Sequence, residues 1–411
     1  MNLKENLINF SNRIFKRKNG VLMILIFLAF SMWLGIIFFG SSAYVDEKIH
    51  DRQINRFFKG NYDLLSNLTT IPGYHVVIAS ISKILNNHSS QQSRFISLFF
   101  SLLSIWVFYL VAKKINSKNS TKRTLQYTFL PISFLYFPLI YTDIFSLLIV
   151  FTAFYFSLSR KYKSSALFSL FSILVRQNNI VWVVFIWIYS YIQEYGFSFS
   201  VEKIKNYTSR TFGHILVFIM FLLFVFLNKG VAIGEQDQHH MGFYSGNLYF
   251  FLALVGVLFF PILFSNLKKA NLPRIYWGLG LGMLISILLF FFTPDVHRYN
   301  LNMKFLRNII LQFAYNKYIF AYAFSIILGC VALFLMKLKN QALLIIPFIA
   351  VCLSQSFLVE QRYSIIPIVF LLLFRQEQKN EAESILIVYF FLFSSSLLFM
   401  LLQLKNIFLA L

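Results

Sequence analysis

Residues 21–40 read VLMILIFLAFSMWLGIIFFG, a run without a charged side chain. An α-helix of roughly 20 apolar residues is long enough to cross the hydrocarbon core of a bilayer. Basic residues cluster before this run, at Arg13 and from Lys16 to Lys18, and no small-residue cleavage site closes it. We therefore expect a retained first membrane helix after a basic cytoplasmic N-terminus over residues 1–20, and not a removed signal peptide.

Composition extends this prediction to the whole chain. Hydrophobic residues make up 58% of the 411 residues and charged residues only 13%, which excludes a water-soluble globular protein. We expect one all-α, polytopic membrane domain over residues 1–411, with about 11 to 13 transmembrane helices, because the two shortest runs must take in adjoining polar residues to span. The further apolar runs are 94–112, 125–141, 143–158, 164–175, 178–193, 211–228, 248–265, 275–293, 318–336, 341–358, 363–374 and 384–404.

The basic residues predict the topology. The chain has 37 Lys and Arg against 15 Asp and Glu, an excess that in a soluble protein would suggest a nucleic-acid partner. Most of them instead fall in the N-terminus and in the loops that alternate to its side, as the positive-inside rule requires of cytoplasmic segments. We expect contacts with membrane lipids there and no nucleic acid. These loops are 113–123, 159–163, 194–210, 266–274, 337–340 and 375–383.

The opposite loops combine acids, bases and imidazoles, which are the groups that acid–base chemistry uses. A transporter would instead need ionisable groups near the bilayer midplane, and none are evident. We therefore expect a reaction at the outer membrane surface. The loops hold six of the seven histidines together with Asp46, Glu47, Asp143, Arg176, Glu235, Asp237, Asp295, Arg298, Glu360 and Arg362.

The first outer loop, residues 41–93, begins with two adjacent carboxylates, Asp46 and Glu47. If residues 46–59 are helical, Asp46, His50 and Gln53 share one face of an amphipathic helix that lies on the membrane. Carboxylates next to hydrocarbon are costly unless they are paired or used. They are candidate general bases, and the alternative is a solvated pair at the helix boundary.

Five short motifs on the outer face resemble those of one enzyme family. They are YVDEKIHDRQ (44–53), TTIPG (69–73), LIYTD (139–143), RQNNIVWV (176–183) and EQRYSIIP (360–367). Their letters and order are similar to those of the ALG10 (DIE2) family of dolichyl-phosphate-glucose-dependent alpha-1,2-glucosyltransferases. Two motifs depart from that family: residues 234–239 read GEQDQH in place of GDKSNH, and residues 295–299 read DVHRY in place of DNRHY.

The resemblance implies a GT-C glycosyltransferase-like bundle in the endoplasmic reticulum membrane, with a luminal first loop that contains interfacial helices and carries the active site. It implies glucose transfer from dolichyl phosphate glucose, with inversion, to the terminal glucose of the lipid-linked oligosaccharide, which receives its third, alpha-1,2-linked glucose in N-glycosylation. The expected base is Asp46, with Glu47 as the alternative. The expected substrate-binding residues are His50, Gln53, Thr70, Asp143, Arg176, Gln177, Asn179, His239, Arg298, Glu360, Arg362 and Tyr363.

Among these, the arginines are the candidate phosphate ligands, with Arg362 first because its motif is best preserved. The structural alternative is a guanidinium that caps a helix end or pairs with Asp143 or Glu360. We expect neither a metal nor another cofactor, because the outer face has no H-E-x-x-H or D-x-D pattern and the two cysteines lie inside apolar runs. Alternative functions are another polyprenyl-phosphate-sugar transferase, bacterial or mannosyl, or a non-catalytic transporter or channel-associated protein.

Overall fold

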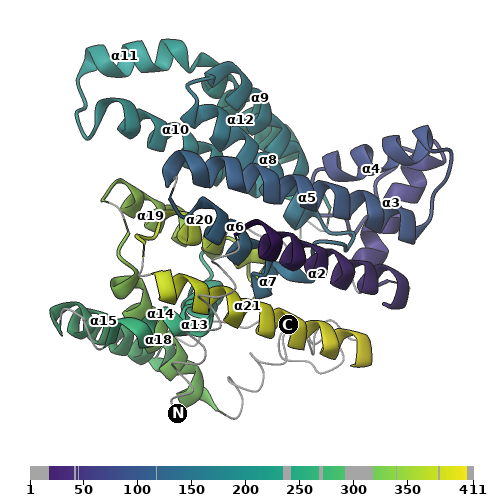
Figure 1. Cartoon of the computed structure of the whole chain (residues 1–411). Helices are drawn as coiled ribbons and strands as arrows, with labels where there is room; N and C mark the ends of the chain where they lie inside the picture. The colour runs from purple at the N-terminus through teal and green to yellow at the C-terminus, as the bar shows by residue number, and fades with distance from the viewer. Residues whose placement is uncertain are drawn as a thin grey trace.

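The computed structural model describes residues 18–40, 43–44, 46–116, 118–234, 242–267, 272–291, 318–338, 340–377 and 380–404. Across these ranges the regular elements are helices, apart from one isolated β-bridge between Leu338 and Arg375, so the predicted all-α fold is confirmed (Figure 1). The α-helices are α2 (Lys18–Phe39), α3 (Glu47–Phe58), α4 (Gly73–Ile84), α5 (Ser90–Ile115), α6 (Ser120–Thr128), α7 (Pro131–Phe134), α8 (Thr142–Leu158), α9 (Tyr162–Val175), α10 (Ile180–Tyr195), α11 (Val201–Arg210), α12 (Phe212–Asn228), α13 (Gly246–Leu258), α14 (Phe260–Leu267), α15 (Leu272–Phe291), α18 (Ile319–Met336), α19 (Ile345–Ser354), α20 (Ile365–Phe374) and α21 (Asn380–Leu404). Short 3₁₀ turns are η1 (Gln177–Asn179), η4 (Asn340–Leu344) and η5 (Gln361–Ser364).

Several of the predicted spans are built from pieces rather than from one long helix. By length and composition, α5, α15, α18 and α21 could each cross a bilayer alone, and α11 with α12 makes a fifth candidate that is bent by 78°. Other apolar runs are shorter helices of 10–17 residues. As expected from its length, the run 363–374 takes in polar residues, because η5 precedes α20 directly. The chain is a multi-pass α-helical membrane protein.

The run 125–141 is not a transmembrane helix, contrary to the prediction. Helix α6 ends at Thr128, α7 is a single turn, and the chain then runs without regular structure to Tyr141. Pro131 and Pro138 lack the backbone N–H that a continuous helix needs. Irregular backbone is tolerated at membrane depth only where protein buries it.

Side chains of three neighbouring helices satisfy the backbone of this buried segment. The indole of Trp33 donates to the carbonyl of Phe134 at 3.0 Å, and the Ser101 hydroxyl donates to that of Phe137 at 2.6 Å. The hydroxyl of Ser394 donates to Phe129 O at 2.8 Å. The segment therefore passes through the middle of the bundle, between α2, α5 and α21.

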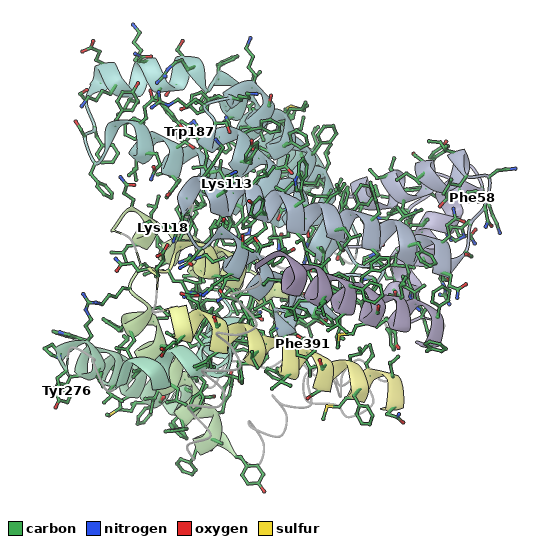
Figure 2. All side chains as sticks on the ribbon, in the orientation of Figure 1. Phe58, Lys113, Lys118, Trp187, Tyr276 and Phe391 are labelled. Atoms are coloured by element: carbon green, nitrogen blue, oxygen red, sulfur yellow. The ribbon has the colours of Figure 1, made fainter. Side chains whose placement is uncertain are left out.

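Two ends of the bundle differ in chemistry, as the loop charges predict. Lys113 and Lys118 lie at the far end of α5 from Phe58 of α3 (Figure 2). At the lysine end the buried guanidinium of Arg123 donates to the carbonyl of Leu372 at 2.8 Å, which ties α6 to the end of α20. Helices α3 and α4 lie at the other end, beside the start of α5. The acidic residues of the first outer loop are at this second end.

Candidate active site

Helix α3 has the two-faced character that its sequence predicts. Asp46 occupies the N-cap position, and the inward face carries the buried side chains of Glu47, His50 and Gln53. Lys48 and Arg52 on the other face are exposed. The apolar Ile54 and Phe57 complete the inward face, so packing fixes how this helix presents its acidic N-terminus.

Asp46 meets an arginine that is more than three hundred residues away in the sequence. Arg362 Nη2 donates to Asp46 Oδ2 at 2.8 Å, while Arg362 Nε pairs with Glu360. The Arg362 guanidinium carbon lies 5.5 Å from the ring centres of both Tyr141 and Tyr363. Two carboxylates and two aromatic rings thus surround one guanidinium. Burial lowers the pKa of Arg362, but the charges of Glu360 and Asp46 outweigh it and hold that pKa well above its usual range.

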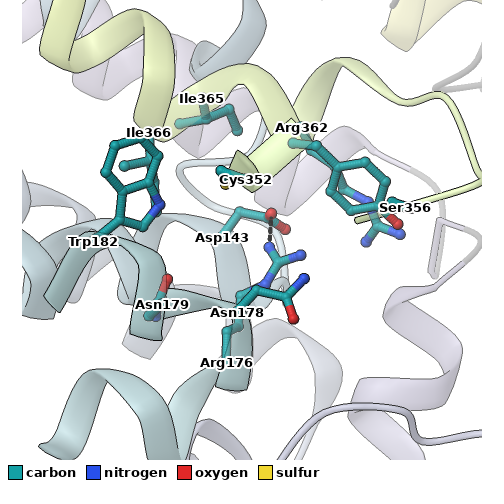
Figure 3. Close-up of a pocket in the computed structure, with 11 residues that line it drawn as sticks. Asp143, Arg176, Asn178, Asn179, Trp182, Cys352, Ser356, Arg362, Ile365 and Ile366 are labelled. Atoms are coloured by element: carbon teal, nitrogen blue, oxygen red, sulfur yellow. Dashed lines mark hydrogen bonds and ion pairs between the residues drawn. The ribbon is translucent and has the colours of Figure 1, made fainter. Parts of the chain in front are cut away.

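A second arginine faces the same place. Arg176, at the start of η1, pairs with Asp143 in the first turn of α8, and its guanidinium lies 5.8 Å from the ring of Tyr363. Arg176 and Arg362 both line a pocket whose apolar wall includes Trp182, as Figure 3 shows. The other lining residues are Asp143, Asn178, Asn179, Cys352, Ser356, Tyr363, Ile365 and Ile366. The pocket therefore has two cationic side chains next to an apolar wall.

Two histidines form a buried, uncharged pair behind the acidic residues. The Nδ1 atom of His50 lies 2.9 Å from Nε2 of His75, which sits on α4. Burial, followed by the charges of Arg362 and Arg176, lowers the pKa of His50 to about 3. Burial also lowers the pKa of His75 well below its usual value. Both imidazoles are therefore neutral near pH 7, and one donates a hydrogen bond to the other.

Comparison with known proteins agrees with the motifs that meet in this site. The profile of the DIE2/ALG10 family matches residues 40–203 and 190–373, which include every outer motif described above. The chain belongs to the DIE2/ALG10 family. Its relatives include the mouse Dol-P-Glc:Glc(2)Man(9)GlcNAc(2)-PP-Dol alpha-1,2-glucosyltransferase, 24% identical over 332 residues, or 67% of this chain and 69% of the mouse protein. The Arabidopsis thaliana protein of the same name is 22% identical over 436 residues, 80% of this chain and 85% of its own.

Among solved structures, the chain is similar to that of ArnT from Cupriavidus metallidurans bound to undecaprenyl phosphate. The TM-score is 0.42 at 14% sequence identity, over 96% of this chain and 74% of the bacterial one.

Several residues of the DIE2/ALG10 motifs hold loops in place in this structure. Gln53 bonds the backbone of Asp63 and Leu65 at 3.1 and 2.8 Å. Gln177 ties η1 to two other segments. Its amide accepts from Ile71 N and donates to the carbonyls of Thr69 and Val231. A substrate-binding role for these two glutamines stays a prediction.

Two further predicted ligands differ in how their polar groups are satisfied. Asn179 donates to Ser146 Oγ and to the carbonyl of Ser172, both at 2.7 Å, and so packs α10 against α8 and α9. Thr70, by contrast, has a buried hydroxyl without a partner among the described residues. Asn179 lines the pocket, whereas Thr70 does not, and a substrate-binding role for either residue stays a prediction.

The structure brings part of the predicted site together. The pocket is lined by Asp143, Arg176, Asn179, Arg362 and Tyr363, and Asp46 and Glu360 pair with Arg362. His239 and Arg298 lie outside the described residues. The sequence did not predict Arg94, His75 or Tyr141 as parts of the site, since the spacing of distant segments does not show which segments come into contact. Arg94 did carry a signal, because it is a charge at the start of an apolar run.

No cluster of three or more His, Cys, Asp or Glu that could hold a metal occurs in the part of the chain that the structure describes. The expected independence from metal stays a prediction. The cation charge beside the pocket comes from Arg176 and Arg362.

Proposed function

We propose that this chain transfers glucose from dolichyl phosphate glucose to the terminal glucose of a lipid-linked oligosaccharide and forms an alpha-1,2 linkage with inversion. Membership of the DIE2/ALG10 family and the names of its relatives support this activity. We place the reaction at the luminal face of the endoplasmic reticulum membrane, in a GT-C-like bundle. The observation that carries the proposal is the contact of Asp46 with Arg362, which lines a pocket together with Arg176.

The pocket suits the phosphate end of a polyprenyl phosphate sugar. Arg176 and Arg362 each offer a planar fork of N–H donors, which matches a phosphate better than a point charge does. Arg176 lies just before η1 and α10, and Arg362 lies in η5 just before α20, where the helix dipole also favours an anion. Trp182 and Ile366 supply an apolar surface next to these cations for the first isoprene units of the lipid.

The reaction requires one base and one stabilised leaving group. The 2-hydroxyl of the acceptor glucose attacks the anomeric carbon, the bond from that carbon to the phosphate oxygen breaks, and dolichyl phosphate leaves with the bonding electrons. Asp46 accepts the hydroxyl proton. Arg176 and Arg362 neutralise the charge that develops on the phosphate.

Substrate must change the ion pairs that the free protein shows. Arg362 is held by Asp46 and Glu360, and Arg176 by Asp143, so a bound phosphate takes over part of each guanidinium. This exchange releases the Asp46 carboxylate from Arg362, so that it can accept the proton of the acceptor hydroxyl. Asp143 Oδ2 is buried and has no hydrogen-bond partner among the described residues, which suits it to accept from a sugar hydroxyl.

The test is lipid-linked oligosaccharide profiling in cells that lack their own enzyme for the third glucose. Expression of this chain should convert the two-glucose oligosaccharide into the three-glucose form. A profile that stays at two glucoses, with the protein present in microsomes, would refute the acceptor assignment. Transfer from dolichyl phosphate mannose and not from the glucose donor would favour the mannosyl alternative.

Metal dependence is tested in the same microsomes. We expect EDTA to leave glucose transfer unchanged, because a lipid monophosphate leaving group needs less charge compensation than a nucleotide diphosphate and two arginines already face the pocket. Loss of activity that Mg²⁺ or Mn²⁺ restores would contradict this.

A further inference from the structure

The carboxylate of Glu47 is enclosed by hydrogen-bond donors. The side chain is fully buried, with no exposed surface. Arg94 grips it with both Nε and Nη2, at 3.1 and 2.6 Å from Oε1 and Oε2. The backbone amides of Tyr44 and Ile140 donate to the same two oxygens, each at 2.8 Å. Each Glu47 oxygen therefore accepts two hydrogen bonds, and the negative charge is compensated within the protein.

The four donors come from three separate parts of the fold. Tyr44 lies in the chain between α2 and α3, Arg94 in the second turn of α5, and Ile140 in the irregular buried segment before α8. One carboxylate thus fixes the start of α3 to α5 and to the buried segment that precedes α8. Arg94 is itself buried and lies 5.5 Å from the ring of Tyr44, so the whole cluster is closed to water.

Both sides of the Asp46–Arg362 contact depend on this cluster. Asp46 directly precedes Glu47, so the anchored carboxylate sets where the N-terminus of α3 lies. On the other side, Tyr141 directly follows Ile140, and its ring packs against the Arg362 guanidinium. The Tyr141 hydroxyl also reaches the carbonyl of Tyr44, at 3.4 Å.

We propose that Glu47 and Arg94 are a positioning pair, which holds the base Asp46 and the Tyr141 platform of Arg362 in register, and that Glu47 is not the base. The inference rests on the proposed function and assigns separate roles to the two adjacent acids. Glu47 would have to lose its four donors before it could meet an acceptor hydroxyl. Arg94, which no motif identified, becomes necessary for turnover without touching the substrate.

The experiment measures glucose transfer from dolichyl phosphate glucose, as kcat/KM against pH, for the detergent-purified full chain. The variants are Glu47→Gln, Arg94→Met, the double variant of both, and Asp46→Asn. Asp51→Asn is the matched control, because Asp51 is a carboxylate on the same helix whose partners, Ser90 Oγ at 2.7 Å and His88, lie outside the pocket. Protein amount and thermal unfolding are recorded for each variant.

We expect Glu47→Gln to lower kcat/KM by about 10²-fold, as a misplaced catalytic group does, and to keep the acidic limb of the wild-type profile. A residual activity in Asp46→Asn should lack that limb, since the limb reports the base. Arg94→Met alone should be less active than the double variant, because it leaves a buried carboxylate unpaired. Asp51→Asn should stay within a few-fold of wild type.

Two results would overturn the inference. One is a Glu47→Gln profile without the acidic limb while Asp46→Asn retains it, which would make Glu47 the base. The other is simple additivity of the Glu47 and Arg94 effects, which would show that they do not act together. If the wild-type chain transfers no glucose at all, the proposed function itself fails, whereas an active wild type with either result overturns only the pair.

Discussion

Arg362 connects the two halves of the site through the chemistry of its planar guanidinium. It pairs with Asp46 and Glu360 and packs against the rings of Tyr141 and Tyr363. A lysine would keep the positive charge but could neither form two directed pairs at once nor stack on the rings.

We therefore expect Arg362→Lys to lower kcat/KM for dolichyl phosphate glucose by about 10² to 10³-fold, the usual effect of removing one donor to a developing anion. Steady-state kinetics in detergent micelles measure this. The matched control is Arg210→Lys, since Arg210 pairs with Glu194 at the opposite end of the bundle. If kcat/KM fell equally in the two variants, Arg362 would affect activity only by stabilising the folded protein.

The histidine pair gives a pH prediction at the same scale. An unfolded histidine takes up a proton near pH 6.5, whereas buried His50 does so only near pH 3. Between these values the unfolded chain binds more protons, so the free energy of unfolding falls as pH drops below about 6.5. His50→Gln should reduce the loss of stability between pH 7 and pH 5 by about 2 kcal/mol.

Thermal unfolding of the purified protein at the two pH values tests this. Asp51→Asn should leave the difference unchanged. Burial raises the pKa of Asp51, but the hydrogen bond from Ser90 and the His88 ring 3.4 Å away outweigh it and keep that pKa below its usual acidic value. A His50→Gln variant that loses as much stability as wild type would contradict the neutral pair.

At the scale of elements, the site depends on how α4 meets α9. Gly73, the first residue of α4, lies so close to the end of α9 that a Cβ there would stand 2.4 Å from the carbonyl oxygen of Leu174. Arg176 follows two residues later. The glycine thus permits a backbone contact that sets the entry to η1.

Gly73→Ala should push α4 away from α9 and lower the free energy of unfolding by about 1–3 kcal/mol, the range for overpacking. Gly35→Ala is its control, since a Cβ at Gly35 on α2 would meet nothing within 4 Å. Melting temperatures compare the two. An unchanged Gly73→Ala protein would show that the helices can separate freely there.

Sequence could predict elements and faces better than it could predict contacts. The charge-free run of α2 and the polar and apolar sides of α3 follow from local patterns that the structure confirms. The prediction of a transmembrane helix over 125–141 was wrong, because a Phe-rich stretch has the same composition whether it forms a helix or an irregular segment that the bundle buries. Arg94 and Glu47 are 47 positions apart, and no periodicity relates them.

Across the molecule as a whole, the proposed reaction requires the site and the basic loops to lie on opposite sides of the membrane. Asn87, in a sequon, is exposed in the turn between α4 and α5 at the site end, whereas Asn119 belongs to a sequon at the lysine end.

Expression in cells that glycosylate proteins should attach a glycan at Asn87 and none at Asn119. Electrophoretic mobility before and after glycosidase treatment, with Asn87→Gln and Asn119→Gln as controls, reports both. A glycan at Asn119 would place the lysine end in the lumen and reverse the topology.

The role of Asp46 as acceptor of the hydroxyl proton is tested most directly by the rate of glucose transfer by Asp46→Asn. We expect a folded, membrane-inserted protein whose turnover from dolichyl phosphate glucose falls by about 10² to 10⁴-fold. Turnover within a few-fold of wild type, at equal protein amount, would contradict it.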